Sequence, residues 1–277
     1  MVEFRTELFI QHLPQTAIGL VIVSIAGLVY YFGNKSNSNR ALGFYRKHKP
    51  LMVSRYGYMK TAILREAPSS HRAFLSGREN VEGTIVDYYD YPHQDILAYL
   101  GNIVVPFTPY HVICSRLKKM FPHTFLLCAK DSFSYLDSLN ENYLDGLKFF
   151  DFGDFVIFTE TAEIKTAYTD ILSKYDLSGI NFIHVADYDP EDILVDYVYI
   201  QSRGDFITSF NLETELVDFA GTTIFAHSAK KIDQIRLIMK RDEIEAEKEK
   251  KAIAAKKEKT QEQYERDMQR KMRRKNF

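Results

Sequence analysis

The chain has 277 residues, and its 36 Lys and Arg side chains nearly balance its 37 Asp and Glu side chains, for a formal net charge of −1. Two cysteines exclude the disulfide framework of a small secreted protein, and without further Cys or a matching His pattern they exclude a zinc site. Cys114 and Cys128 lie in apolar, strand-like runs, so we interpret them as reduced packing residues of a cytosolic domain.

The near balance of charge hides a division along the chain. Residues 1–227 carry 19 basic and 27 acidic side chains, a net charge of −8, whereas residues 228–277 carry 17 and 10, a net charge of +7. An acidic body with a basic tail predicts that the tail meets a polyanion.

Residues 14–33 form an apolar segment long enough to cross a membrane. From Ala17 to Phe32 there is no charged, Asn or Gln side chain, and the only polar interruptions are Ser24 and the phenols of Tyr30 and Tyr31. A helix needs about 20 residues to cross roughly 30 Å of hydrocarbon. The alternative, a buried helix of a soluble core, usually shows a polar face at this length. The segment therefore predicts a membrane-spanning helix.

The charges that flank this segment predict its orientation. Five basic residues follow it, and no acidic residue appears before Glu66. Positive charge stays on the cytosolic side, so we expect a lumenal N-terminus and a cytosolic domain from residue 34 onward. A cleaved signal peptide is disfavoured, because the leading region is not basic and Tyr-Tyr-Phe-Gly is a poor cleavage site. The five basic residues are Lys35, Arg40, Arg46, Lys47 and Lys49.

A polar linker is expected over residues 34–40, followed by a helix over 41–59 in which Leu42, Tyr45 and Met52 make apolar contacts and Pro50 kinks or splits the helix. The expected division of the chain is a short lumenal segment, a membrane helix, a juxtamembrane linker and helix, a cytosolic domain, and a long charged helix. Their bounds are 1–13, 14–33, 34–59, 60–212 and 213–277.

The body alternates between strand and helix patterns, which predicts an α+β or α/β domain whose strand order cannot be read. The expected strands are 83–91, 111–117, 124–129, 154–159, 180–185 and 206–211. The expected helices begin near Gln94, cover 132–144 and cover 161–175.

From Glu213 to about Arg274 the chain has no proline and a single glycine, Gly221, which favours a long helix. Its apolar spacing never holds a heptad for three cycles, so a two-stranded coiled coil is weakly supported. Charged pairs four residues apart are typical of a single solvated helix, and disorder in the absence of a partner is the alternative.

No motif in the chain predicts catalysis. The sequence contains no GxxxxGK[ST], GxGxxG, HExxH or GxSxG pattern. His111, His123, His184 and His227 are far apart in sequence and fit surface or core positions better than a catalytic role. We therefore expect neither an enzyme nor a cofactor.

A dense acidic cluster, DYDPEDILVD, allows two interpretations. Carboxylate oxygens in a loop are suitable ligands for a hard cation, but the spacing lacks the EF-hand glycine and the terminal Glu. Asp189 before Pro190 instead resembles a helix N-cap followed by first-turn acidic residues. Capping is favoured, and no metal site is predicted. The acidic residues are Asp187, Asp189, Glu191, Asp192 and Asp196.

The densest basic run lies at the end of the tail and is opposed only by Asp267. Clustered cations bind a phosphate backbone by releasing counterions, and they also bind anionic lipid. This pattern does not distinguish ribosomal RNA from anionic lipid as the binding partner, and we select ribosome binding as the hypothesis. The residues are Arg266, Arg270, Lys271, Arg273, Arg274 and Lys275.

The segment Ile96–Phe107 contains no charge but is too short to cross a bilayer. It fits ordinary core, and it also fits an interfacial hairpin pressed into the cytosolic leaflet. The candidate membrane-contacting residues are Ile96, Leu97, Leu100, Ile103, Val104, Val105 and Phe107.

Several segments, in this order and spacing, resemble the calumin-like family, the coiled-coil-containing larger subunit of the endoplasmic reticulum PAT complex. The resemblance covers about residues 16–277, and no single motif is highly specific. The segments are ALGFYRKHKPLMVSRY (41–56), SGRENVEG (76–83), HQDILAYL (93–100), DFVIFTETAEI (154–164), ITSFNL (207–212) and TTIFAHSAKKIDQIRL (222–237).

The resemblance implies a single-pass protein of the endoplasmic reticulum membrane that is not an enzyme. It implies contact with the ribosome and the Sec translocon, and pairing with a small multi-helix subunit that shields polar helices of nascent multipass membrane proteins. Calcium binding in the family is ascribed to an acidic lumenal region. Only Glu3 and Glu7 precede the apolar segment here, so lumenal calcium buffering is doubtful for this chain. The competing hypothesis is a membrane tether or calcium-homeostasis protein whose basic tail binds anionic lipid.

Overall fold

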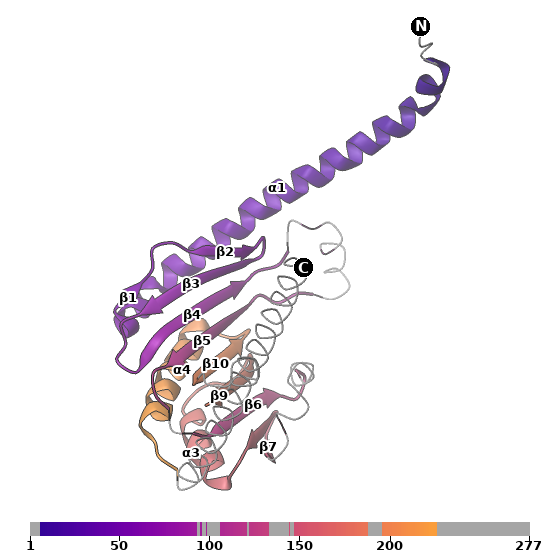
Figure 1. The fold of residues 1–277 in the computed structure, drawn as a ribbon. Helices are drawn as coiled ribbons and strands as arrows, with labels where there is room; N and C mark the ends of the chain where they lie inside the picture. Colours follow the sequence, from indigo (N-terminus) through magenta and orange to yellow (C-terminus); the bar gives the residue numbers. More distant parts are fainter. Residues whose placement is uncertain are drawn as a thin grey trace, which may run out of the picture. The chain divides into compact units, whose positions relative to one another are not determined.

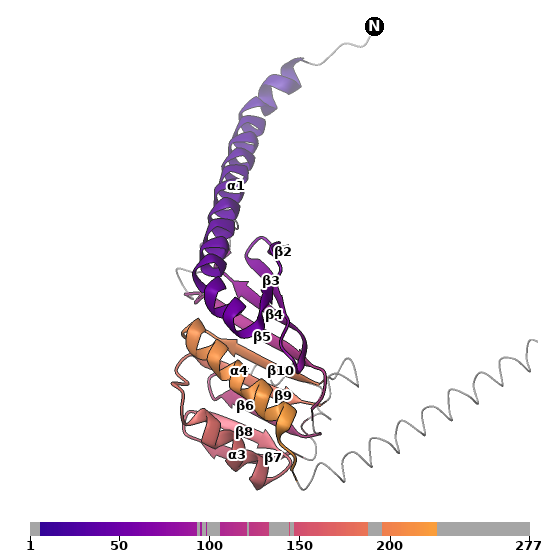
Figure 2. The same cartoon turned by 90° about the vertical axis from the view of Figure 1, so that its left-hand side faces the viewer.

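A computed structural model describes residues 6–92, 95, 98, 106–120, 122–132, 144, 147–187 and 196–225. In this part of the chain, a long N-terminal helix leads into a large sheet, and helices cover one face of that sheet (Figure 1). Figure 2 shows the same helices, α1, α4 and α3, following one another across the sheet.

Helix α1 (Thr6–Tyr56) is continuous over 51 residues. The expected linker over 34–40 is wrong, because these residues are helical, and the helix also continues through Pro50 without a second start. Asn and Ser have modest helix propensity, but contacts with the sheet stabilise the helix here, as tertiary packing usually does. The apolar segment and the part of the chain that packs on the sheet therefore belong to one continuous helix.

Gly57 ends α1. Its φ of 79° is in the left-handed region that glycine adopts without strain, and its N–H donates to the carbonyl of Val53 at 2.7 Å. The chain can then reverse into the first strand.

Ten strands form one sheet in the described part of the chain. They are β1 (Tyr58–Met59), β2 (Leu64–Ala67), β3 (Ser70–Ser76), β4 (Val81–Tyr89), β5 (Tyr110–Leu117), β6 (Thr124–Ala129), β7 (Lys148–Phe152), β8 (Phe155–Thr159), β9 (Ile180–Ala186) and β10 (Tyr197–Ser202).

The strand order is β1-β3-β4-β5-β10-β9-β6-β8-β7, with β2 paired to β3. Every pairing is antiparallel. The α+β class is thus confirmed, whereas a parallel α/β arrangement is wrong. The expected strands at 83–91, 111–117, 124–129, 154–159 and 180–185 correspond to β4, β5, β6, β8 and β9.

Helix α3 (Ala162–Leu172) confirms the helix expected over 161–175, and the Thr161 side chain caps it by accepting the N–H of Ile164. It buries Ile164, Tyr168, Ile171 and Leu172 on one face. The helices expected near Gln94 and over 132–144 fall largely outside the described residues.

Helix α4 (Phe206–Thr222) corrects two expectations. Residues 206–211 are helical rather than a strand, and Glu213 lies inside this helix rather than at the start of a long tail helix. The Asp205 carboxylate caps α4 by accepting the Thr208 N–H at 3.0 Å. The helix ends at Thr222, and the folded unit that begins at the N-terminus extends to Phe225. The tail beyond it lies outside the described residues.

Helical spacing explains why β-favouring residues form a helix here. The buried positions of α4 recur every three or four residues, so one face of a helix, and no face of a strand, buries them all. They include Phe206, Phe210, Glu213, Leu216, Val217 and Ala220.

Candidate membrane-proximal functional site

The first half of α1 presents large apolar side chains that the folded domain does not cover. Between Ile18 and Phe32 they expose from 50% of their surface at Tyr30 to 69% at Val23. Only 6% of the apolar window is buried, so the alternative of a soluble core helix is wrong for this conformation. Within the described residues, α1 is the one helix long and apolar enough to cross a membrane.

The second half of α1 packs against the sheet through a single face. Its buried residues recur every three or four positions, the spacing of one helix face. The stripe begins at the residue after Phe32, so no free linker separates the apolar span from the packed part. The residues are Gly33, Asn37, Ala41, Tyr45, His48, Met52 and Tyr56.

Hydrogen bonds fix this half of α1 to β3 and β4. The Asn37 amide donates to the carbonyl of Pro68 at 3.2 Å, at the β2–β3 turn. The Tyr45 hydroxyl lies 2.6 Å from the carbonyl oxygen of His71 and 2.8 Å from that of Val86, and burial raises the pKa of its phenol. Because the contacts of the Tyr45 hydroxyl are buried, losing this donor is costly.

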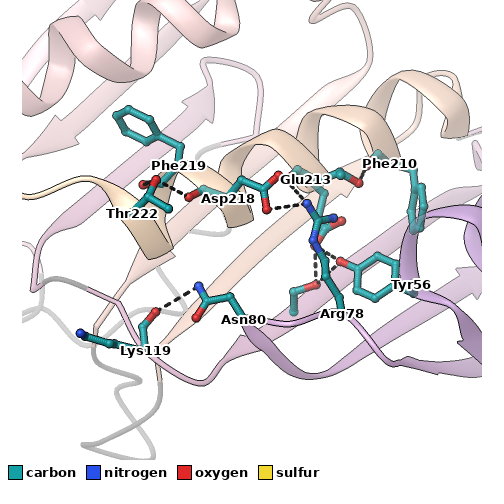
Figure 3. A network of polar contacts seen from close by, with 11 residues as sticks. Tyr56, Arg78, Asn80, Lys119, Phe210, Glu213, Asp218, Phe219 and Thr222 are labelled. Carbon is teal, nitrogen blue, oxygen red and sulfur yellow. Dashed lines mark hydrogen bonds and ion pairs between the residues drawn. The ribbon is translucent and has the colours of Figure 1, made fainter.

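A buried polar cluster joins the end of α1 to α4 (Figure 3). The Tyr56 hydroxyl donates to Glu213 Oε1 at 2.6 Å, and the Ser115 hydroxyl donates to the same oxygen. Thr84 lies 2.6 Å from Ser115 through their hydroxyls. Burial raises the pKa of Glu213, while the two donated bonds oppose this rise.

Arg78 closes the cluster from the β3–β4 turn. Its guanidinium lies 2.6 Å from the Asp218 carboxylate, donates to the carbonyl of Thr214 at 3.1 Å, and stands 5.6 Å from the centre of the Tyr56 ring. Figure 3 shows this side chain between Tyr56 and Asp218. Glycine at position 77 lets the β3–β4 turn lie close to the end of α1, because a Cβ there would lie 2.5 Å from the Tyr56 carbonyl oxygen. The cluster connects α1, β4, β5 and α4, and its centre of Tyr56, Ser115 and Glu213 is buried, which fits a structural role.

Aromatic rings and two histidines fill the space between α1, β5 and the start of α4. Phe44 stacks on Tyr88 at 4.5 Å, and Phe206 lies 4.6 Å from His48 and 5.2 Å from His111 between ring centres. Burial lowers the pKa of His111 to about 4 and also lowers that of His48. Both rings are therefore neutral packing groups at physiological pH.

A second aromatic group lies where β4 ends and β5 begins. Tyr89 stacks on Tyr110 at 4.5 Å, and Phe107 lies 5.9 Å from Tyr91 and 6.2 Å from Tyr110. In Figure 1 these strand ends point in the direction in which α1 leaves the sheet toward its N-terminus. Nearby, Arg40 on α1 forms an ion pair of 3.7 Å with Asp90.

The structure places few of the predicted site residues. Phe107 is 38% exposed and belongs to this aromatic group. The other candidate membrane-contacting residues, Ile96, Leu97, Leu100, Ile103, Val104 and Val105, lie outside the described residues. So do the candidate ribosome-binding residues Arg266, Arg270, Lys271, Arg273, Arg274 and Lys275.

The histidines expected to be surface or core residues are buried at separate places where the structure describes them. His123 pairs with the Tyr168 hydroxyl at 2.6 Å and His184 with that of Tyr197 at 2.8 Å. His227 lies outside the described part. Neither cysteine forms a disulfide, as expected, and Cys128 is buried whereas Cys114 is partly buried.

No group of three or more His, Cys, Asp or Glu side chains is arranged to hold a metal among the described residues. Of the acidic cluster, Asp187 and Asp196 are described, and Asp196 accepts the N–H of Met120 at 2.9 Å. Burial raises the pKa of Asp196 to about 6. The proposed cap at Asp189 and Pro190 lies outside the described residues.

An open groove of about 810 Å³ lies at the end of β6 and the starts of β8 and β9. Its lining mixes Lys130 and Arg203 with acidic residues, and Lys130 is already held by the carbonyl of Gly153 and the carboxylate of Asp151. The groove therefore has no charge or donor pattern that selects a ligand.

These features define a class of protein, in which, over the described residues, one candidate membrane-spanning helix continues into an antiparallel α+β domain. Residues 14–276 match the family described as PAT complex subunit CCDC47, and the chain belongs to that family. The expected resemblance to the PAT-complex larger subunit is thus confirmed. The family is not a family of enzymes, and its description implies a complex with another subunit. No curated protein matches the chain.

Sequence reasoning missed the buried stripe of α1 and the Glu213 cluster. Leu42, an expected apolar contact, is 38% exposed, whereas Tyr45 and Met52 are buried as expected. The repeated spacing of three and four from Gly33 to Tyr56 is the signal that identifies the stripe. A glutamate at helical spacing between the apolar residues Phe210 and Leu216 is the corresponding signal for Glu213.

Proposed function

We propose that this protein is a single-pass endoplasmic reticulum subunit of a PAT-type complex that supports insertion and folding of multipass membrane proteins, with its domain in the cytosol. It binds the ribosome and the Sec translocon and pairs with a small multi-helix partner subunit. The family match supports membership of the complex. The ribosome, the translocon and the client proteins are our inference.

The continuity of α1 is the observation that carries this proposal. An exposed apolar span and a packed stripe follow each other in one helix without a linker. Gly33 and Asn37 lie one and five residues after Phe32, a helix rise of only about 2–8 Å, so the β2–β3 turn lies within or next to the headgroup layer. A domain held this close to the bilayer is suited to a place beside a membrane channel.

The basic tail supplies the contact with the ribosome in this proposal. Its net charge of +7 follows a body of −8, and the densest cations are at its end. Contacts with an RNA backbone position a protein without reading sequence, and they weaken steeply with salt.

Co-sedimentation of the detergent-solubilised full-length protein with ribosomes across a salt series tests the proposal. We expect wild-type binding to fall with salt and a variant with Arg270, Lys271, Arg273, Arg274 and Lys275 all changed to Glu to lose it. Binding that is undiminished in this variant, or indifferent to salt, contradicts ribosome binding through the tail. If the variant instead loses binding to anionic liposomes alone, the lipid tether or calcium-homeostasis alternative is favoured.

Orientation is tested with glycosylation acceptors. The cations after the apolar span predict that an acceptor before Pro14 is modified and that one after Asn34 is not. The opposite pattern would place the domain in the lumen and exclude any role at the ribosome.

The proposed membrane contact of residues 96–107 is tested by Ile103→Asp and Val105→Asp. Interfacial insertion predicts that both variants fold but partition less strongly to membranes of the reticulum. Unfolding of the domain would assign the segment to the core.

A further inference from the structure

A compact basic surface lies on the outward side of the packed half of α1. Arg46, Lys47 and Lys49 are all exposed, while His48 between them is buried against Phe44 and Phe206. Arg46 and Lys49 are one helical turn apart, so their side chains are neighbours. We call these three residues the α1 basic turn.

The α1 basic turn is not neutralised within the described part of the chain. None of its side chains forms an ion pair or hydrogen bond with another described side chain, whereas Arg40, one and a half turns earlier, pairs with Asp90. The sequence of α1 contains no acidic residue after Glu7. The helix dipole does not account for the cluster, because its effect is confined to the last turn, near Arg55.

Charge near a membrane anchor also directs insertion, and the α1 basic turn lies within the range over which that rule counts. Insertion explains the sign of the charges in the nascent chain. Among the described residues, however, the same charges remain clustered, exposed and unpaired in the folded domain, and the packed stripe beneath them holds this part of the helix against the sheet.

Distance separates these residues from the lipid headgroups. Arg46 lies 14 residues beyond Phe32, which is a helix rise of about 21 Å, and Lys49 lies about 25 Å beyond it. The headgroup layer covers roughly the first 5–8 Å. The remaining separation along the helix is roughly twice the Debye length of about 8 Å at physiological salt. Lys35, only three residues beyond Phe32, is the cation placed for lipid.

We propose that the α1 basic turn is a second RNA-binding surface, which contacts the phosphate backbone of ribosomal RNA independently of the C-terminal tail. This inference rests on the proposed ribosome-bound function and adds a contact to it. A protein partner is disfavoured, because lysine is depleted in protein interfaces and this surface has no exposed aromatic side chain to fill a pocket. Exposed, unpaired cations are the groups that phosphate contacts use.

The salt dependence of ribosome binding tests the proposal. Full-length protein is compared with the triple variant Arg46→Glu, Lys47→Glu and Lys49→Glu by co-sedimentation between about 50 and 200 mM salt. Three lost phosphate contacts lower the slope of log affinity against log salt by about 2–3 units, so wild-type affinity falls roughly 40-fold more than the variant's across this range. The tail is unchanged in both proteins.

Two further variants serve as controls. Lys60→Glu, Arg65→Glu and Lys148→Glu together produce the same change in net charge at scattered exposed positions, and we expect the wild-type slope. Arg46→Gln, Lys47→Gln and Lys49→Gln remove the contacts without adding acidic charge next to the membrane anchor. Glycosylation acceptors confirm that each variant keeps the wild-type topology.

The outcomes distinguish this inference from the function on which it rests. If wild type binds ribosomes and the Gln and Glu variants keep its salt slope, the α1 basic turn does not contact RNA, while the tail proposal stands. If wild type does not bind at all, the proposed function fails first. If the variants lose binding to anionic vesicles and keep the ribosome slope, the turn is a lipid contact and the inference is overturned.

Discussion

The two halves of α1 have the same secondary structure and opposite surroundings. Between Ile18 and Phe32 large apolar side chains are exposed, whereas from Gly33 to Tyr56 polar and small residues are among those buried. A soluble protein would bury the first set as well. The first half therefore has the exposed apolar surface of a candidate membrane-spanning helix and the second half has the packing of a folded domain, and the change between them occurs within one turn.

A one-residue insertion is the strongest way to break this comparison. An Ala inserted after Tyr45 rotates half of the buried stripe by about 100° relative to the rest. It separates Asn37 and Ala41 from their partners while Met52 and Tyr56 stay in place, so we expect loss of the folded domain, measured by pulse proteolysis in detergent. The same insertion after Val23, in the exposed half, leaves the stripe intact and the protease resistance unchanged.

Replacing Tyr45 with Ala is expected to lower the free energy of unfolding by about 3–5 kcal/mol, because it removes a fully buried ring and the single hydroxyl donor that lies between the carbonyl oxygens of His71 and Val86. Urea unfolding of the full-length protein in detergent measures the loss. Tyr31→Ala is the matched control, since Tyr31 is 59% exposed in the other half, and equal effects at both positions would contradict the comparison.

Glu213 predicts a pH dependence of stability. Its folded pKa is raised above the ordinary value of 4.5, so the folded state binds its proton more tightly than the unfolded state does. The contribution to stability is therefore complete below about pH 4.5 and is lost as pH rises through the folded pKa, with a slope of at most about 1.4 kcal/mol per pH unit. Glu213→Gln removes this dependence.

Urea midpoints measured from acid to neutral pH check this expectation. Asp196, whose pKa is raised to about 6, adds a slope of the same sign, so the difference between wild type and Glu213→Gln is the quantity to compare. If Glu213→Gln has the same pH profile as wild type, ionisation of Glu213 does not lower the free energy of unfolding and the expectation is wrong.

The smallest expected effect is at Leu42. Its side chain is 38% exposed, so Leu42→Gln is expected to change the free energy of unfolding by no more than about 0.5 kcal/mol. Met52→Ala, at a fully buried position of the same helix, is expected to cost about 2–5 kcal/mol. The same urea measurement compares both variants. A large loss of unfolding free energy in Leu42→Gln would indicate that α1 has a second contact face.

The sequence by itself determined the features that depend on local pattern. An uninterrupted apolar helix is stable only in lipid or in a protein core, so the composition of residues 14–33 identified the candidate span. Short apolar runs located β6, β8 and β9, whose expected bounds agree with the structure within a residue. Helical period likewise located α3.

Only the tertiary structure decided the features that depend on distant partners. Residues 34–40 have the composition of a linker, but Asn37 finds the carbonyl of Pro68, and the stripe that begins at Gly33 keeps the segment helical. Residues 206–211 have the composition of a strand, but α1, β5 and β10 offer their apolar side chains a single helical face to pack on. Local propensity is worth tenths of a kcal/mol per residue, and burial of a ring is worth several, so packing prevailed at both places.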